Sequence, residues 1–205
     1  MSGGEGKRAV LATGNEGKRA ELEAILSRTL PGMTVVTSSA LGLTSPVEDG
    51  TTFEENALIK ARAAAADAGM PAFADDSGLT VSILGGAPGI FSARWSGAHG
   101  DDLANNRLLL AQLADVKDAD RGAAFVCAAA FVDTDGTEIV CRGALPGTLA
   151  RAPRGSGGFG YDPIFIPEGQ ERSLAEYSRE EKNAVSHRGR AFTELVEKVR
   201  AHIAG

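Results

Sequence analysis

The stretch Ala9–Leu30, AVLATGNEGKRAELEAILSRTL, changes its hydrophobic pattern as it runs. It begins with the apolar run AVLAT, which is typical of a buried strand, and continues through the polar turn TGNEGK. The segment 17–30 then carries its apolar residues at helical spacing: Ala20, Leu22, Ala24, Ile25 and Leu26. A strand that passes directly into a helix is half of a βαβ unit, so this stretch predicts an α/β fold.

Later segments of the chain repeat this alternation and then change to a hairpin. The second helix is expected to begin near Thr52, because Thr52 and Glu55 have capping-box spacing. The third strand is expected to break at Ser77-Gly78. Because βα units come first and a hairpin later, we expect a single α/β domain over 1–205 with a mixed sheet, and a flexible leader at 1–6. The other elements are expected as strands at 33–39 and 71–76, helices at 51–69, 101–113 and 187–203, a hairpin at 123–145 and a Gly-rich loop at 151–167.

The composition limits the possible partners. The chain has 205 residues, 43% of them hydrophobic and 23% charged, with a formal net charge of −6. An acidic surface repels a polyphosphate backbone, so nucleic-acid binding is not expected, although a small anionic substrate remains compatible with local Lys and Arg or a divalent cation. No apolar stretch has the length of a membrane span, and the start MSGGEGKR lacks a signal-peptide core, so we expect a cytoplasmic protein that does not bind membranes.

Two cysteines, Cys127 and Cys141, lie on either side of the turn DTDGT. Their apolar neighbours favour free, buried thiols over a disulfide or a metal site. If Asp135-Gly136 is a two-residue turn, the pairing register places the two thiols on opposite faces of the hairpin.

The turn TGNEGK lies where a strand ends and a helix begins, a place where free backbone N–H groups favour phosphate. Thr13 and Asn15 can donate hydrogen bonds, and Lys18 supplies positive charge. The turn is not a Walker A loop, because Ala12 and Arg19 replace the required Gly and Ser or Thr. Taken alone, the stretch fits an ordinary Asn/Gly turn better than a phosphate site.

Adjacent carboxylates occur in the stretch FADDSGL. Neighbouring strand residues point to opposite faces, so Asp75 and Asp76 should have different roles. One of them can hold Mg²⁺ or accept a proton from water, although Asp, Ser and Gly also simply end strands.

A second acidic stretch, PVEDGTTFEEN, suits a helix N-terminus, yet one acid ahead of that helix can share a metal with the aspartate pair. Lys60 and Arg62 in the following helix are interpreted as a solvated face. The acids of this stretch are Glu48, Asp49, Glu54 and Glu55.

Near the C-terminus, GGFGYDPIF and EEKNAVSHRGRAF carry candidate groups for a nucleotide base. Glycines allow close approach of the backbone, and Phe159 offers a stacking face, although loop aromatics more often fill a core. Arg188 donates only, so it prefers a base edge with a carbonyl oxygen, whereas a lone histidine such as His187 is more often structural.

The motifs TGNEGK, TFEENALIKA, ADDSGL, GAPGIFSARWSG, GGFGYDPIF and EEKNAVSHRG occur in this order. Together they closely resemble the inosine/xanthosine triphosphate pyrophosphatase (Ham1-like) family, whose members clear non-standard purine nucleotides. The resemblance covers nearly the whole chain and leaves out only 1–6 and 115–121.

The resemblance implies an elongated mixed sheet with flanking helices that forms a central cleft, usually in a homodimer. It also implies Mg²⁺-dependent hydrolysis of ITP, dITP or XTP between the α- and β-phosphates, giving a monophosphate and pyrophosphate. Asp76 would be the general base, Glu48 and Asp76 the metal ligands, and Glu55 a less direct carboxylate. The expected substrate contacts are Thr13, Gly14, Asn15, Glu16, Gly17, Lys18, Ser77, Phe159, Gly160, Tyr161, Asp162, Lys182, His187 and Arg188.

This assignment agrees with the chemistry of the bases. Hypoxanthine and xanthine present a carbonyl oxygen where adenine has an amine, so donors from Arg188 and His187 would disfavour ATP. Two other functions fit parts of the sequence: a pyrophosphatase for pyrimidine nucleotides, and a nucleotide-binding regulator without turnover. The base-contact stretches count against the former, and the ADDSGL carboxylates, which would repel phosphate in a pure binder, count against the latter.

Overall fold

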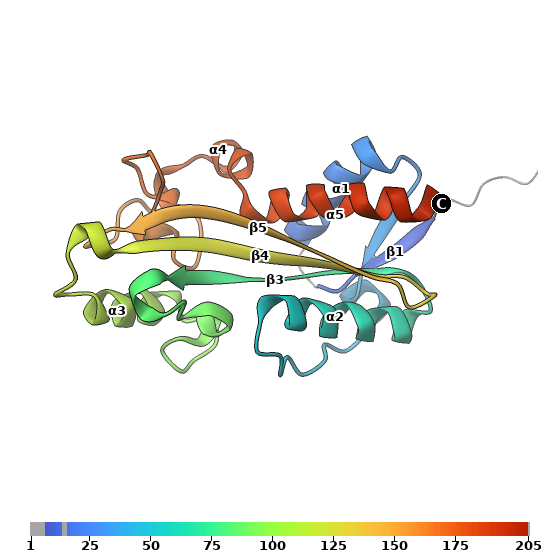
Figure 1. Cartoon of the computed structure of the whole chain (residues 1–205), viewed down its shortest axis with the longest axis horizontal. Coiled ribbons are helices and arrows are strands. Elements are labelled where there is room, and N and C mark those ends of the chain that lie inside the picture. Colours follow the sequence, from blue (N-terminus) through green and yellow to red (C-terminus); the bar gives the residue numbers. More distant parts are fainter. Residues whose placement is uncertain (1–6, 14–15, 205) are drawn as a thin grey trace, which may run out of the picture. The chain divides into compact units, whose positions relative to one another are not determined.

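The computed structural model describes residues 7–13 and 16–204 (Figure 1). The strands are β1 (Arg8–Leu11), β2 (Thr34–Thr37), β3 (Ala72–Val81), β4 (Gly122–Val132), β5 (Glu138–Leu149) and β6 (Phe165–Pro167). The α-helices are α1 (Glu16–Thr29), α2 (Phe53–Ala68), α3 (Asp102–Gln112), α4 (Arg179–Ala184) and α5 (His187–Ala204). No helix among these described residues has the length and apolar character needed to cross a membrane.

Six strands form one sheet in the order β2-β1-β3-β4-β5-β6. Strand β1 pairs in parallel with β2 and β3, whereas β5 and β6 are antiparallel, so the expectation of an α/β fold with a mixed sheet is confirmed. The described residues divide into two compact units. The first unit comprises 7–76, 127–143 and 188–204, and the second comprises 77–126 and 144–187.

In the first unit, α1 and α5 cover one face of the sheet and α2 covers the other (Figure 1). Helix α2 begins as expected, since the Thr52 hydroxyl accepts a hydrogen bond from the Glu55 N–H at 3.1 Å. The Glu55 carboxylate, however, accepts from the N–H and hydroxyl of Thr51, so the capping box is only half formed. Gly69 ends the helix in the left-handed conformation with a φ of 61°, as the sequence predicts.

Both cysteines are free and buried, as predicted, but they share one core cluster with residues of α1 and α5. The prediction that they face opposite sides of the hairpin is therefore wrong. The Asp133 N–H donates to the Thr137 carbonyl at 2.9 Å, and Gly136 has a φ of 88°. The connection thus holds more residues than a two-residue turn, and this shifts the register by one position and brings both thiols to the same face.

Strand β3 does not break at Ser77-Gly78, as the sequence suggested, but continues to Val81. A Cβ atom on Gly78 would lie 2.4 Å from the Ser92 hydroxyl, in the 3₁₀ helix η3 (Gly89–Arg94). That hydroxyl accepts from the Leu79 N–H at 2.9 Å and donates to the Gly89 carbonyl at 2.6 Å. Glycine at this position permits close packing against the strand rather than ending it.

In the second unit, a core of β3, β4, β5 and α3 side chains is extended by a buried arginine. The Arg121 guanidinium donates to the carbonyl oxygens of Leu113, Leu149 and Ala150 at 2.7–2.8 Å. Arg121 belongs to 115–121, the internal segment that the resemblance leaves out, and its side chain joins the end of α3 to the end of β5.

Candidate active site

Asp75 and Asp76 of β3 lie next to each other and contact different cations. The Asp75 carboxylate is buried, and both of its oxygens accept from the Lys18 Nζ at 2.9 Å. The Arg188 Nε donates to the same carboxylate at 3.1 Å. Lys18 comes from the first turn of α1 and Arg188 from the first turn of α5. The two aspartates thus have different contacts, and that they have different roles stays a prediction.

The charges around Asp75 determine its protonation. Burial alone would raise the pKa of its carboxyl group, but the positive charges of Lys18 and Arg188 outweigh burial and hold this pKa well below its usual range. Asp75 is therefore ionised at neutral pH and acts as the fixed counter-charge of two cations.

Asp76 has the opposite shift. Burial raises the pKa of its carboxyl group, and the positive charge of Lys60 only partly offsets this. The Lys60 Nζ lies 3.1 Å from Oδ1, and the Asn56 Nδ2 lies 3.4 Å from Oδ2. A carboxylate with a raised pKa that is oriented by two neighbours is suited to accept a proton.

Glu48 joins this group through the same lysine. The Lys60 Nζ lies 3.2 Å from the Glu48 Oε2, so the carboxylates of Glu48 and Asp76 meet at one ammonium group. The loop that carries Glu48 is tied to α2, because the Asn56 Oδ1 accepts from the Gly50 N–H at 2.9 Å. Glu55 takes no part in these contacts and instead bonds to Thr51.

Lys60 and Asn56 are the functional candidates that the sequence reasoning missed. The sequence predicts a solvated face at Lys60, yet its side chain is only 13% exposed. A signal was available: Asn56 and Lys60 stand four residues apart, which places both side chains on one face of a helix.

The oxygen donors of Glu48 and Asp76 fit Mg²⁺, because this ion prefers carboxylate oxygens and retains waters. The carboxylates of Glu48 and Asp76 both contact the Lys60 ammonium group, so they can approach a common cation.

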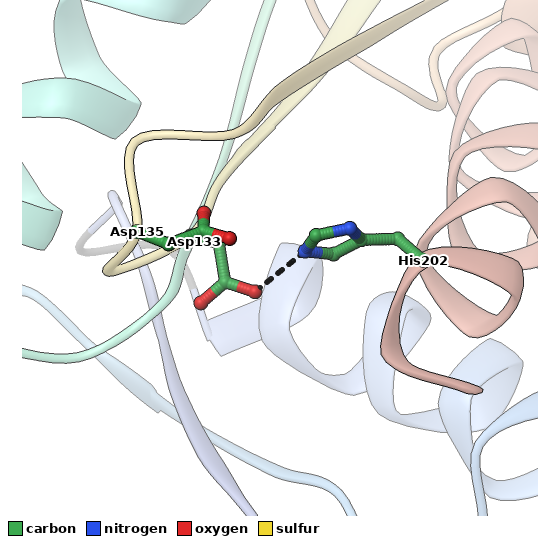
Figure 2. Close-up of side chains that lie close together, drawn as sticks. All are labelled: Asp133, Asp135 and His202. Carbon is green, nitrogen blue, oxygen red and sulfur yellow. Dashed lines mark hydrogen bonds and ion pairs between the residues drawn. The ribbon is translucent and has the colours of Figure 1, made fainter. Parts of the chain in front are cut away.

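A different cluster lies at the β4–β5 loop, where the ligand atoms of Asp133, Asp135 and His202 are within 4.8 Å of one another (Figure 2). His202 is in the last turn of α5, and its Nε2 lies 2.9 Å from the Asp133 Oδ2. The sequence did not predict this contact, which joins the hairpin loop to α5.

The Gly-rich loop in the second unit presents an aromatic ring. The Phe159 side chain is 68% exposed, and the Lys182 Nζ lies 4.2 Å from the centre of its ring. The buried Asp162 carboxylate accepts from the Phe159 N–H at 2.8 Å and also pairs with Lys182. The expected contacts Phe159, Asp162 and Lys182 are thus brought together.

Tyr161, a further expected substrate contact, packs in the core of the second unit. Its ring is buried, and its hydroxyl donates to the Ser92 carbonyl at 2.8 Å. Its Gly160 neighbour is held by α3. The Gly160 N–H donates to the Asp102 Oδ2 at 2.6 Å, and the Gly160 carbonyl accepts from the Asn106 Nδ2 at 2.9 Å.

His187 begins α5 and stacks on the Phe125 ring, with ring centres 5.3 Å apart. Ser77 is half-buried within β3. In the turn before α1, Thr13 accepts from the Ser38 hydroxyl through its carbonyl at 3.2 Å, and Gly17 is exposed in the first turn of the helix. Gly14 and Asn15 lie outside the described residues, as does the side chain of Glu16.

Comparisons with known proteins find relatives over nearly the full length of this chain. The model of the Ham1 family matches residues 9–198. The dITP/XTP pyrophosphatase of Streptomyces avermitilis is 58% identical over 194 residues, covering 94% of this chain and 97% of that protein. The dITP/XTP pyrophosphatase of Mycobacterium tuberculosis strain H37Rv is 52% identical over 202 residues, covering 97% and 98%.

Two solved structures are also similar. A nucleoside-triphosphatase / dITP/XTP pyrophosphatase from Mycobacterium abscessus has a TM-score of 0.80 at 50% identity, covering 92% of this chain and 98% of that chain. A HAM1 protein from Coxiella burnetii has a TM-score of 0.85 at 40% identity, covering 97% and 98%. The resemblance seen in the motifs is confirmed, and the chain belongs to the Ham1 family.

Proposed function

We propose that this chain hydrolyses the non-standard purine nucleotides dITP, ITP and XTP to the monophosphate and pyrophosphate, which keeps them out of DNA and RNA. The activity for which its relatives are named, dITP/XTP pyrophosphatase, supports this reaction class. The observation that carries the proposal is the group formed by Glu48, Lys60 and Asp76, in which burial raises the pKa of the Asp76 carboxyl.

Asp76 is the general base in this proposal. Its carboxylate takes a proton from the water that attacks the α-phosphorus, while the bond from the α-phosphorus to the bridging oxygen breaks and pyrophosphate leaves with that oxygen. Lys60 and Asn56 hold the carboxylate in place through its two oxygens. The Lys60 charge also partly offsets the rise in the Asp76 pKa that burial causes.

The triphosphate is assigned to the turn Thr13–Lys18 at the N-terminus of α1. N–H groups in the first turn of a helix and the helix dipole both favour an anion. Lys18 adds an ammonium group whose position is fixed by the buried Asp75 carboxylate. Arg188 is held by the same carboxylate, so its guanidinium is oriented before a substrate arrives.

Glu48 and Asp76 would hold Mg²⁺, which supplies positive charge to the phosphate oxygens when it is bound. The substrate would also be contacted by Ser77, the Phe159–Asp162 loop, Lys182, His187 and Arg188. Among these, Phe159 offers an exposed stacking face, and Arg188 and His187 offer donors for the purine carbonyl oxygen.

We further propose that the chain is one catalytic domain that works as a homodimer in the cytoplasm, where nucleoside triphosphates are used. Large apolar side chains exposed on η2 (Ser82–Leu84), η3 and α3 of the second unit support an interface between copies. They are Ile83, Phe91, Leu103 and Leu108. Light scattering on Phe91→Ser and Leu103→Ser would show monomers if this surface pairs, and an unchanged mass would remove it.

The testing experiment offers the protein dITP, ITP, XTP, dGTP, dATP and dUTP, each with and without Mg²⁺. Pyrophosphate and phosphate are counted separately. We expect metal-dependent pyrophosphate release from the first three substrates and little from the others. Release of phosphate would reassign the broken bond, preference for dUTP would favour a pyrimidine enzyme, and tight binding without turnover would favour a regulator.

A further inference from the structure

Phe159 is an exposed aromatic ring on a loop whose backbone is fixed on both sides. The Gly157 N–H donates to the Ala175 carbonyl at 2.9 Å, and the Phe159 N–H donates to the Asp162 carboxylate at 2.8 Å. Gly158 has a φ of 73°, and a Cβ atom there would lie 2.1 Å from the Asp162 Oδ2. A backbone that is fixed this closely holds in one place the point from which the Phe159 ring projects.

Helix α3 holds the loop backbone directly after Phe159. Asp102, the first residue of α3, accepts from the Gly160 N–H, and Asn106, one turn later, donates to the Gly160 carbonyl. The two residues stand four positions apart on one face of the helix and bind the two polar groups of Gly160. Gly160 itself has a φ of 60°, a conformation that glycine adopts without steric cost and that residues with a side chain disfavour.

The chemistry of Asn106 indicates what it contributes. Its side chain is 5% exposed, and its Oδ1 has no hydrogen-bond partner among the described residues. A buried unpaired oxygen is unfavourable, and a leucine would fill similar space without one. The favourable contribution of the asparagine is therefore its bond to the Gly160 carbonyl.

From these contacts we propose that Asp102 and Asn106 are positioning residues for base recognition: they hold the Gly160 peptide so that Phe159 is ready to stack on the purine. The proposal rests on the proposed function, because it takes the ligand of Phe159 to be the base. A fixed ring lowers the cost of ordering the loop when a ligand binds.

The test compares the two products, which are not hydrolysed: inosine monophosphate carries the base and pyrophosphate does not. We expect Asn106→Asp and Asp102→Ala to raise the Kd for inosine monophosphate about tenfold, within the range that loss of one base–aromatic stack gives. The Kd for pyrophosphate should stay within about twofold of wild type. Asp102→Asn, which keeps an acceptor for the Gly160 N–H, should restore inosine monophosphate binding.

The matched control is Asn105→Asp on the same helix. Asn105 is also buried, but it bonds to Ser96 and Ala93 and not to Gly160, so its substitution should leave inosine monophosphate binding unchanged. In a Phe159→Ala background, Asn106→Asp should change the Kd less than about twofold, because the ring through which it acts is gone.

Unchanged affinity for inosine monophosphate in Asn106→Asp and Asp102→Ala would overturn the proposal. An equal loss of affinity for inosine monophosphate and for pyrophosphate would also overturn it, because it indicates a merely structural role. A full effect of Asn106→Asp on the Kd in the Phe159→Ala background would overturn it too. If Asn106→Asp fails to fold, the comparison of Asp102→Ala with Asp102→Asn decides alone. Wild-type protein that releases no pyrophosphate from dITP would instead contradict the proposed function.

Discussion

Asp75 and Asp76 are neighbours in one strand, yet the pKa of the first carboxyl group is lowered and that of the second is raised. The cause is the alternation of strand side chains. One residue meets two cations in a buried pocket, whereas the other shares a single lysine with Glu48. Because of this contrast, removing the charge at the two positions should affect the free energy of unfolding differently.

Asp75→Asn should lower the free energy of unfolding by about 3 kcal/mol at pH 7, because it leaves two partly buried cations without their counter-charge. A carboxyl whose pKa is lowered in the folded state adds stability above its unfolded pKa of about 4 and loses this as pH falls further. Urea denaturation should therefore show the difference from wild type at pH 7 and a smaller difference below about pH 4. An equal difference at both pH values would contradict the pairing.

Asp76→Asn should leave stability unchanged or higher at pH 7, because the folded state already disfavours the charged form of this carboxyl. Turnover of dITP should fall by a factor on the order of 10²–10⁴, as expected when a general base is removed. The same denaturation experiment and a pyrophosphate assay measure both effects. Wild-type turnover would exclude Asp76 as the base.

Lys60→Met should move the acid limb of the pH–activity profile to higher pH. Burial raises the pKa of Asp76 and the Lys60 charge lowers it, so removing that charge raises the pKa further. The base is then protonated, and inactive, at pH values where the wild type still works. Arg62→Gln is the matched control, because Arg62 is 53% exposed and pairs with Glu138, and its acid limb should not move.

Lys18→Ala should weaken triphosphate binding more than it changes the choice of base, because Lys18 is assigned to the phosphates. Competition by pyrophosphate measures the first effect, and the ratio of kcat/KM for ITP and ATP measures the second. A changed ratio with normal pyrophosphate affinity would reassign Lys18 to the base.

Arg121→Leu should cost at least about 3 kcal/mol of unfolding free energy, because it leaves three carbonyl oxygens without a donor and each costs about 1–3 kcal/mol. Arg151→Leu is the control. Arg151 is 55% exposed and pairs with Asp118, so its loss should cost less than about 1 kcal/mol. Equal costs for the two variants would show that burial of Arg121 adds nothing.

The parts of this structure that could be predicted from sequence are those encoded locally. The change from strand to helix at Thr13–Lys18 follows from hydrophobic spacing, and the ends of α2 at Thr52 and Gly69 follow from capping chemistry. The separation of Asp75 from Asp76 follows from the two-residue repeat of a strand.

The parts that could not be predicted depend on residues far apart in the chain. Lys60 becomes a site residue only because the Glu48 loop and β3 meet it from two sides. Glycine is a residue that commonly ends a strand, and the packing role of Gly78 is seen only from the close approach of Ser92. The face on which Cys141 lies depends on whether the hairpin connection has one residue more or fewer, and local sequence patterns predict this length poorly.

Helix α5 touches different partners at its two ends, Arg188 with Asp75 and His202 with Asp133. These residues are separated by 14 positions, or roughly 21 Å along a helix. Fusions or trimming at the last turn therefore act on the hairpin loop and spare the carboxylate that orients Lys18. The last turn of α5 is therefore a suitable attachment point for a tag or a surface, because it lies away from the Asp75 contacts.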